Sequence, residues 1–152
     1  MYRRVLVPLD GSRVAEAILP FIEQIAGPLD MEVLLVRVVP LTSMDMAAMA
    51  KEAQLGEPIL KELDAQGYLE PLVASLKAKA VRAGARVRIG DPATEIVAAA
   101  KEINADLIAM TTHGRSGLGR LLFGSVAEAV LRGSPIPVFL LRTSEAALAS
   151  AA

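Results

Sequence analysis

Short apolar runs alternate along the chain with segments of helical periodicity. The runs are rich in Val, Leu and Ile, as in strands buried on both faces, and they span 4–9, 31–39, 85–89, 106–111 and 137–141. Between them, apolar residues recur at steps of three and four, which indicates helices with one buried face. Strands that alternate with helices favour a parallel sheet covered by helices. The pattern therefore predicts a single doubly wound α/β domain with a five-stranded parallel sheet flanked by helices.

Capping residues indicate where the predicted helices begin and end. Short polar side chains accept hydrogen bonds from the first N–H groups of a helix, and the N-caps that we expect are Ser12, Asp91 and Ser125. Pro92 suits a first helical position, and Glu128 completes a capping box with Ser125. Glycine commonly ends a helix, and the ends that we expect are at Gly27, Gly84 and Gly133. The first helix should then cover 14–25 and the second 58–83.

Two segments lack a clear strand or helix pattern. Residues 41–56 are rich in Met and Ala, and we interpret them as a loop or loosely held helical segment that reorders when a ligand binds. Residues 143–152 are small and polar, as in a frayed chain end. We therefore assign 1–142 to one domain and 143–152 to a disordered tail.

Charge and composition exclude several classes of function. The chain has 16 Lys and Arg against 17 Asp and Glu, so it lacks the basic field that attracts nucleic acid. It has no cysteine, which excludes disulfides, thiol catalysis and cysteine metal sites. No apolar run reaches the roughly 18–20 residues that span a bilayer, and the amino-terminal apolar stretch is too short for a signal peptide. We expect a cytoplasmic protein without nucleic-acid or membrane partners.

Candidate chemistry lies in two loops that follow predicted strands, at 8–12 and 111–125. In open parallel sheets, ligands bind beyond the carboxyl ends of the strands. The second loop holds four glycines and two arginines and leads into a helix, whose unpaired N–H groups suit phosphate oxygens. Two standard motifs do not fit, because Ser125 stands where a Walker A loop needs lysine and Leu122 where the dinucleotide fingerprint needs glycine. A P-loop NTPase and a classical NAD site are therefore not supported.

The spacing of the glycines resembles the universal stress protein family. That family carries Gly-x2-Gly-x9-Gly-Ser/Thr for ribose and phosphates, and here nine residues separate Gly114 from Gly124, which Ser125 follows. In the family an Asp follows the proline of the first strand, as Asp10 follows Pro8 in this chain.

Further similarities extend the resemblance over about residues 2–142. The segment from Gly90 to Pro92 and the closing strand after Pro135 look like their counterparts in the family. One position departs from the pattern, because Thr111 stands where the family has its first motif glycine. The branched side chain of this threonine either crowds the ribose or contributes its hydroxyl.

The resemblance implies an adenine-nucleotide site, for ATP or for AMP or ADP, with Mg²⁺ or Mn²⁺ carried by the phosphates. The residues that it assigns to adenosine are Pro8, Leu9, Asp10 and Val38, the last facing adenine through its backbone. Those assigned to ribose and the first phosphates are Met110, Thr111 and Gly114. Those assigned to the phosphate chain are Arg115, Gly124, Ser125 and Val126.

The resemblance also implies the strand order 3-2-1-4-5 and a homodimer formed through the last strand, 138–141. An apolar edge strand left bare is an aggregation hazard, which gives dimerisation a physical reason. The implied function is that of a stress-response or regulatory protein that acts through nucleotide-dependent conformation and binding to a partner protein.

Other interpretations stay open beside this one. A nucleotide-free dimeric scaffold of the same fold is favoured by Thr111. The sequence leaves open whether the protein is an enzyme, and slow ATP hydrolysis is the most that we expect, because His113 has no nucleophile or second histidine paired with it by a motif. Asp10 and Ser125 also suit helix capping, and Arg120 suits a solvated surface.

Overall fold

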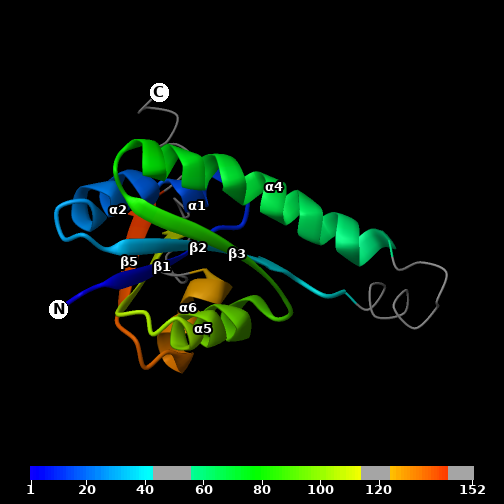
Figure 1. Ribbon diagram of the computed structural model, residues 1–152. Helices are drawn as coiled ribbons and strands as arrows, with labels where there is room; N and C mark the ends of the chain where they lie inside the picture. Colours follow the sequence, from blue (N-terminus) through cyan, green and yellow to red (C-terminus); the bar gives the residue numbers. More distant parts are fainter. Residues whose placement is uncertain (43–55, 114–123, 144–152) are drawn as a thin grey trace.

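The computed structural model describes residues 1–42, 56–113 and 124–143 (Figure 1). Five parallel strands form one sheet in the order β3-β2-β1-β4-β5. Their bounds are β1 Arg4–Pro8, β2 Glu32–Val39, β3 Arg82–Ile89, β4 Leu107–His113 and β5 Val138–Thr143. The order confirms the predicted doubly wound fold, in which the strand order reverses between β1 and β4.

Helices cover both faces of the sheet (Figure 1). Their bounds are α1 Arg13–Glu16, α2 Leu19–Ala26, α4 Gly56–Ala78, α5 Pro92–Glu102 and α6 Ser125–Gly133. The first three lie on one face, and α5 and α6 lie on the other. None of the helices in the described ranges is both long and apolar enough to cross a membrane.

Each face of the sheet has its own apolar core. Alternate residues of β1 point to opposite faces, so Val5 and Val7 join the core under α2 and α4 while Leu6 joins the core over α5 and α6. The first core includes Ile22 of α2 and Leu69 of α4, both essentially inaccessible to solvent. Because β1 is buried on both faces, its sequence is a continuous apolar run, and this run is the pattern from which the strand was predicted.

The first predicted helix is in fact two, which corrects the expectation of one helix over 14–25. The helix α1 ends at Glu16, and α2 starts again at Leu19 with Pro20 in its first turn. A proline ring clashes with the carbonyl four residues earlier, here that of Glu16, so the first helix cannot continue through this position. The predicted N-cap Ser12 is confirmed, since its hydroxyl accepts a hydrogen bond of 3.1 Å from the N–H of Ala15.

The second predicted helix was drawn too long, because α4 ends at Ala78 and not at residue 83. Ala80 adopts a positive φ of 59°. The N–H groups of Ala80 and Val81 donate to the carbonyls of Lys77 and Leu76, which is the hydrogen-bond pattern of a Schellman motif. Gly84, which we expected to end the helix, lies inside β3 beside Leu34.

The same motif ends α2 and α5, again with a residue other than glycine in the left-handed conformation, while the predicted Gly27 is confirmed as the C-cap of α2. Asp30 and Asn104 have φ values of 50° and 51°, and the residue after each donates back to the helix. Each following residue is apolar and buried, as Met31 and Ala105 are. A buried apolar residue just beyond the helix therefore fixes where three helices end and the next strands begin.

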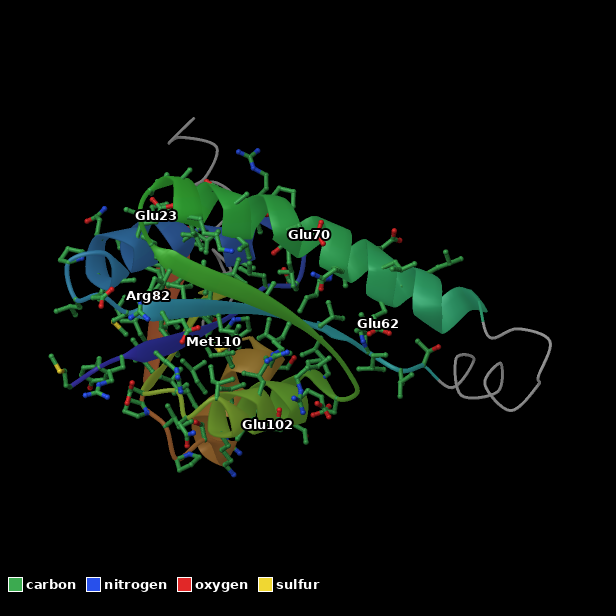
Figure 2. The ribbon with its side chains drawn as sticks, in the orientation of Figure 1. Glu23, Glu62, Glu70, Arg82, Glu102 and Met110 are labelled. Carbon is green, nitrogen blue, oxygen red and sulfur yellow. The ribbon has the colours of Figure 1, made fainter. Side chains whose placement is uncertain are left out.

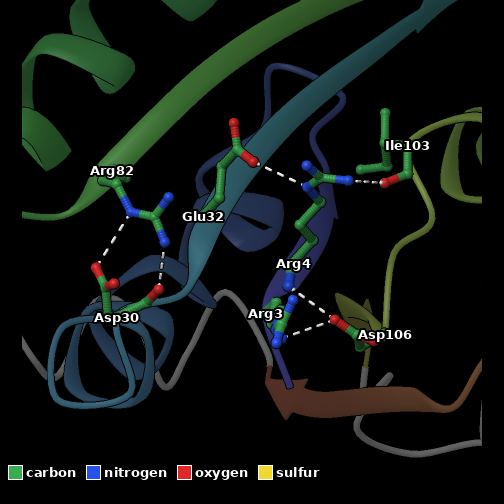
Figure 3. A network of polar contacts seen from close by, with 7 residues as sticks. All are labelled: Arg3, Arg4, Asp30, Glu32, Arg82, Ile103 and Asp106. Carbon is green, nitrogen blue, oxygen red and sulfur yellow. Dashed lines mark hydrogen bonds and ion pairs between the residues drawn. The ribbon is translucent and has the colours of Figure 1, made fainter. Parts of the chain in front are cut away.

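Polar contacts join the amino ends of the strands (Figure 3). The Asp106 carboxylate accepts hydrogen bonds of 2.7 and 2.9 Å from the N–H groups of Arg3 and Arg4, which lower its pKa. The Arg4 side chain donates to Glu32 of β2 at 3.0 Å and to the carbonyl of Ile103. These contacts join β1, β2 and β4 at the amino edge of the sheet. Ligand sites of such sheets lie at the opposite, carboxyl edge.

Candidate functional site

A cleft of about 400 Å³ lies beyond the carboxyl ends of β1, β2 and β4. In open parallel sheets, ligands bind beyond the carboxyl ends of the strands, next to the point where the strand order reverses, and this cleft has that location. Its lining residues are Pro8, Leu9, Asp10, Ala15, Val36, Arg37, Val38, Pro40, Pro92, Ile96, Met110, Thr111 and Val126.

The loop after β1 forms one wall of the cleft and is held by its own hydrogen bonds. The Asp10 carboxylate accepts a hydrogen bond of 2.9 Å from the N–H of Ser12, and the N–H of Leu9 donates to the carbonyl of Val36. Gly11 has a φ of 90°, a conformation that side chains rarely adopt. The exposed Asp10 is therefore presented at the cleft by a short turn of defined shape.

A second wall is apolar and comes from β2 and α5. The pairing of β1 with β2 stops at Pro8 and Val36, so Val38 has no partner on β1 and borders the cleft instead. Pro40 after β2, and Pro92 and Ile96 of α5, complete this wall. Flat apolar surface next to unpaired strand backbone suits an aromatic ring with hydrogen-bonding atoms on its edge.

The end of β4 forms the floor. Met110 is 6% exposed and lies on the side of the sheet that α5 and α6 cover (Figure 2). Thr111 faces the other way, and its hydroxyl donates to the carbonyl of Ala15 at 3.3 Å. The hydroxyl of Thr111 is thus engaged with the backbone of α1, while the residue still lines the cleft.

Thr112 connects β4 to α6 and was missed by the sequence analysis. It is the one buried polar side chain of the described residues, at 3% exposure. Its hydroxyl accepts a hydrogen bond of 2.9 Å from the N–H of Gly124, which closes the loop between the strand and the helix. The sequence signal for this contact was a threonine at the end of an apolar strand. The sequence alone does not indicate that its hydroxyl bonds to Gly124.

The amino terminus of α6 differs from the expected capping box. Gly124 is the N-cap, its carbonyl accepts from the N–H of Glu128, and no side chain caps the helix. Ser125 is the first helical residue and is exposed, so its predicted N-cap role is wrong. The reason is that Thr112 already holds the N–H of Gly124 and positions the chain one residue earlier. Since no described side chain caps it, the first turn of α6 presents N–H groups and the positive end of the helix dipole.

The structure brings seven of the eleven predicted site residues to the cleft. These are Pro8, Leu9, Asp10, Val38, Met110, Thr111 and Val126. Gly124 and Ser125 lie next to Val126 at the start of α6. Gly114 and Arg115 lie outside the described residues, as do Arg120, most of the segment 41–56 and the tail 144–152.

The charges at the cleft are few. Among the residues that line it, Asp10 and Arg37 are the charged ones. In the described ranges, no three His, Asp or Glu side chains gather where they could hold a metal ion. Among the described residues the arrangement offers apolar contact, strand backbone and two opposite charges, which suits the binding of a small polar ligand.

A larger hollow of about 540 Å³ lies at the opposite, amino edge of the sheet. Its lining includes Arg4, Asp30, Arg82 and Asp106, which Figure 3 shows. Two ion pairs lie there, since Arg4 pairs with Glu32 at 3.0 Å and Arg82 with Asp30 at 3.1 Å. This hollow is therefore a structural ion-pair surface, and the cleft at the carboxyl edge is the better candidate for a ligand site.

Comparison with known proteins identifies the relatives of the chain. The family model described as "Universal stress protein family" matches residues 1–142. A universal stress protein of Methanothermobacter thermautotrophicus is 35% identical over 150 residues, covering 94% of this chain and 97% of that protein. The universal stress protein MJ0531 of Methanocaldococcus jannaschii is 32% identical over 142 residues, covering 93% and 83%.

Solved structures share the fold. That of MJ0577, from the same Methanocaldococcus species, superposes with a TM-score of 0.79 at 26% identity and covers 95% of this chain and 99% of its own. A universal stress protein in complex with cAMP superposes with a TM-score of 0.66 at 24% identity, covering 94% and 98%. One from Archaeoglobus fulgidus in complex with dAMP gives a TM-score of 0.64 at 20% identity, covering 91% and 97%.

Proposed function

The chain belongs to the universal stress protein family, and from this we propose that it binds an adenine nucleotide in the cleft at the carboxyl edge of its sheet. One observation carries the proposal. The cleft joins the Asp10 turn, the unpaired end of β2 and the floor of β4, and Val126 extends it to the first turn of α6. A nucleotide needs these features together, because it has a flat base, a hydroxylated sugar and an anionic chain.

Each part of a nucleotide has a suitable surface in this arrangement. The base lies against the apolar wall, with its polar edge at the backbone of Val38. The ribose lies between the Asp10 turn and the floor formed by Met110 and Thr111. The phosphates extend to the first turn of α6, where Ser125 and Val126 offer backbone N–H groups and the helix offers its positive dipole end, beside Gly124. Gly114 and Arg115 complete the phosphate site in this proposal.

The ligand that we propose is ATP, with AMP and ADP as the other adenine nucleotides that fit the same surfaces. The complexes of two proteins of the same fold with cAMP and dAMP support an adenine mononucleotide. We assign Mg²⁺ or Mn²⁺ to the phosphates of the bound nucleotide and not to a cluster of side chains.

We assign a regulatory role in a stress response, in which bound nucleotide changes the conformation that a partner protein recognises. The chain would act as a cytoplasmic homodimer formed through β5, which is an edge strand of the sheet. Phe139 on this strand is 36% exposed, a large apolar side chain that a second β5 would cover. Any hydrolysis of ATP would be slow, because Asp10 has no second carboxylate and no histidine beside it among the described residues that line the cleft.

A second candidate function is a dimeric scaffold that binds no nucleotide. Thr111 favours it, because its side chain lines the cleft where the family pattern has glycine. In that case the wild-type protein gives no binding heat with millimolar ATP, while the Thr111→Gly variant, which clears this part of the floor, binds it.

The first experiment is to purify the protein without added nucleotide, denature it and identify any released small molecule by mass spectrometry. Calorimetric titration of the stripped protein with ATP follows. Released ATP, ADP or AMP, or saturable binding with a stoichiometry of one per chain, supports the proposal. An empty protein that gives no heat with ATP and with AMP rejects it and leaves the scaffold function in its place.

A further inference from the structure

Arg37 is the charged residue of the cleft that no motif singled out. It lies on β2, inside a run that is otherwise apolar from Val33 to Val39. Its side chain is partly buried and lines the cleft together with Asp10. An arginine in such a run loses hydration when the strand packs, so its position requires an explanation.

Two neighbours hold the guanidinium in place. Its central carbon lies 4.9 Å from the centre of the Tyr68 ring of α4, which is a cation–π contact. On the side of the β1–α1 loop it lies against Gly11, so closely that a Cβ there would come within 2.7 Å of Nη1. Gly11 therefore serves two purposes, since it adopts the positive φ of the turn and leaves room for Arg37.

Tyr68 is partly buried, and the carboxylate of Glu16 is near its hydroxyl. Its hydroxyl is buried and has no hydrogen-bond partner among the described residues. Burial first, and then the negative charge of Glu16, raise the pKa of the phenol. The ring thus stays neutral and offers its face to the cation at neutral pH.

The guanidinium itself makes no hydrogen bond or ion pair with any described residue. Asp10, which lines the same cleft, is bonded to the N–H of Ser12 instead. Arginine carries five N–H donors in a planar fork and no acceptor. Because none of the described residues accepts from these donors, a ligand in the cleft that supplies acceptor atoms would complete the hydrogen bonding of the fork.

We infer that Arg37 contacts the bound ligand directly and donates hydrogen bonds to acceptor atoms of its nucleoside part, with Tyr68 and Gly11 holding the guanidinium ready. The inference rests on the proposed nucleotide site. The nucleoside is the part concerned because Arg37 lies next to Val38 in β2, at the end of the cleft assigned to the base. The phosphates lie across the cleft at α6, beside Val126.

The test compares ATP, adenosine and inorganic tripolyphosphate by calorimetry on the full chain. In Arg37→Met, which keeps an unbranched stem and removes the donors, affinity for ATP and for adenosine falls by the same factor, about tenfold to a hundredfold. Affinity for tripolyphosphate stays as in the wild type. The control is Arg86→Met, because Arg86 is an exposed arginine on the neighbouring strand β3 and lines a different hollow.

Variants of Tyr68 test the holding contact separately. Tyr68→Phe keeps the ring and removes only the unpartnered hydroxyl, so it binds ATP as the wild type does. Tyr68→Leu removes the ring face and weakens binding of ATP and adenosine by a smaller factor than Arg37→Met. Should Arg37→Met unfold at a lower temperature, Arg37→Lys keeps the cation over Tyr68 and the fold but loses the fork, and its affinity for adenosine is still reduced.

Three results overturn the inference. Wild-type affinity of Arg37→Met and Arg37→Lys for adenosine shows that the fork does not touch the nucleoside. Loss of ATP affinity with adenosine affinity unchanged places Arg37 at the phosphates instead. A wild-type protein that binds none of the three probes rejects the proposed nucleotide site, and the inference with it.

Discussion

The hydroxyl of Thr112 accepts a hydrogen bond of 2.9 Å from the backbone N–H of Gly124, across twelve positions of sequence. This contact joins the end of β4 to the start of α6. It therefore sets where the free N–H groups of α6 lie relative to the cleft, although Thr112 itself does not line it.

Removal of this acceptor should weaken the fold and the phosphate site together. Thr112→Val keeps the shape of the side chain but leaves the N–H of Gly124 without its partner, so the free energy of unfolding falls by about 1–3 kcal/mol. ATP affinity falls as well, because the start of α6 is no longer fixed. Chemical denaturation and calorimetry measure the two effects. Thr112→Ser keeps the hydroxyl, and equal ATP affinity in the Val and Ser variants would show that the bond does not support the site.

Ala80 should be a position where glycine stabilises the protein. Its φ of 59° is unfavourable for an L side chain, and glycine adopts it freely. After the entropy that glycine adds to the unfolded chain, Ala80→Gly is expected to raise the free energy of unfolding by about 0.5–1 kcal/mol. Ala78→Gly, two residues earlier in the regular helix, should lower it by about 1 kcal/mol. A loss of stability in both variants contradicts the left-handed conformation of Ala80.

The Asp106 carboxylate should contribute a pH-dependent part of the stability. The N–H groups of Arg3 and Arg4 lower its pKa in the folded state, so the unfolded chain takes up this proton first as the pH falls. The contribution is present above the ordinary carboxyl pKa of about 4 and is lost as the pH falls through the native value. Urea unfolding from about pH 6 to about pH 2 should therefore show the wild type and Asp106→Asn converging in acid. A gap that stays constant over this range would exclude the proposed linkage.

Dimerisation through β5 should depend on Phe139. This side chain is 36% exposed on one edge strand, and Ile89 is 37% exposed on the other edge strand, β3. Phe139→Asp places a charge in the proposed interface and should yield a monomer in light scattering after gel filtration. Ile89→Asp is the matched control and should remain a dimer. A monomeric wild type, or a dimer that only Ile89→Asp disrupts, would show that β5 is not the dimer interface.

The location of the cleft followed from the sequence because buried parallel strands leave a simple pattern, whereas the strand order was implied by the resemblance to the family. Continuous apolar runs are hard to place elsewhere than in a sheet covered on both faces. The carboxyl ends of parallel strands share one edge, so the residues after the first and fourth runs had to meet there. Asp10 and Thr111, 101 positions apart, line the same cleft for this reason.

The ends of helices were predicted less well, because tertiary contacts decide them. Glycine is the residue type expected at a helix end, which is why Gly84 was predicted there. The Schellman motif that ends α4 instead depends on the buried Val81, three residues earlier. Ser125 matches a capping box, yet the hydroxyl of the buried Thr112 accepts the hydrogen bond from the N–H of Gly124, and α6 starts there. Neither competition is visible without the fold. The break between α1 and α2 has a local cause, because Pro20 prevents α1 from continuing. This signal is present in the sequence and was missed.

Arg37 was missed although the sequence contains its signal. A single arginine inside the run Glu32–Val39 is unusual for a strand that packs on both faces. Its role depends on Tyr68 and Gly11, which lie 31 positions after it and 26 positions before it in the chain. Motif comparison assigns residues that a family pattern names, whereas this cluster is recognised only from contacts.

The most direct test of nucleotide binding compares alanine at the two ends of α6. A Cβ at Gly124 or at Gly133 meets none of the described residues within 4 Å, so we expect Gly124→Ala and Gly133→Ala to fold as the wild type does. At Gly124, the Cβ occupies space that bound phosphate would approach, whereas Gly133 lies at the far end of the helix. In calorimetric titration with ATP, Gly124→Ala should lose at least about tenfold in affinity while Gly133→Ala binds as the wild type does. Equal affinity of all three proteins for ATP, or no binding to the stripped wild type, would contradict a nucleotide site at the start of α6.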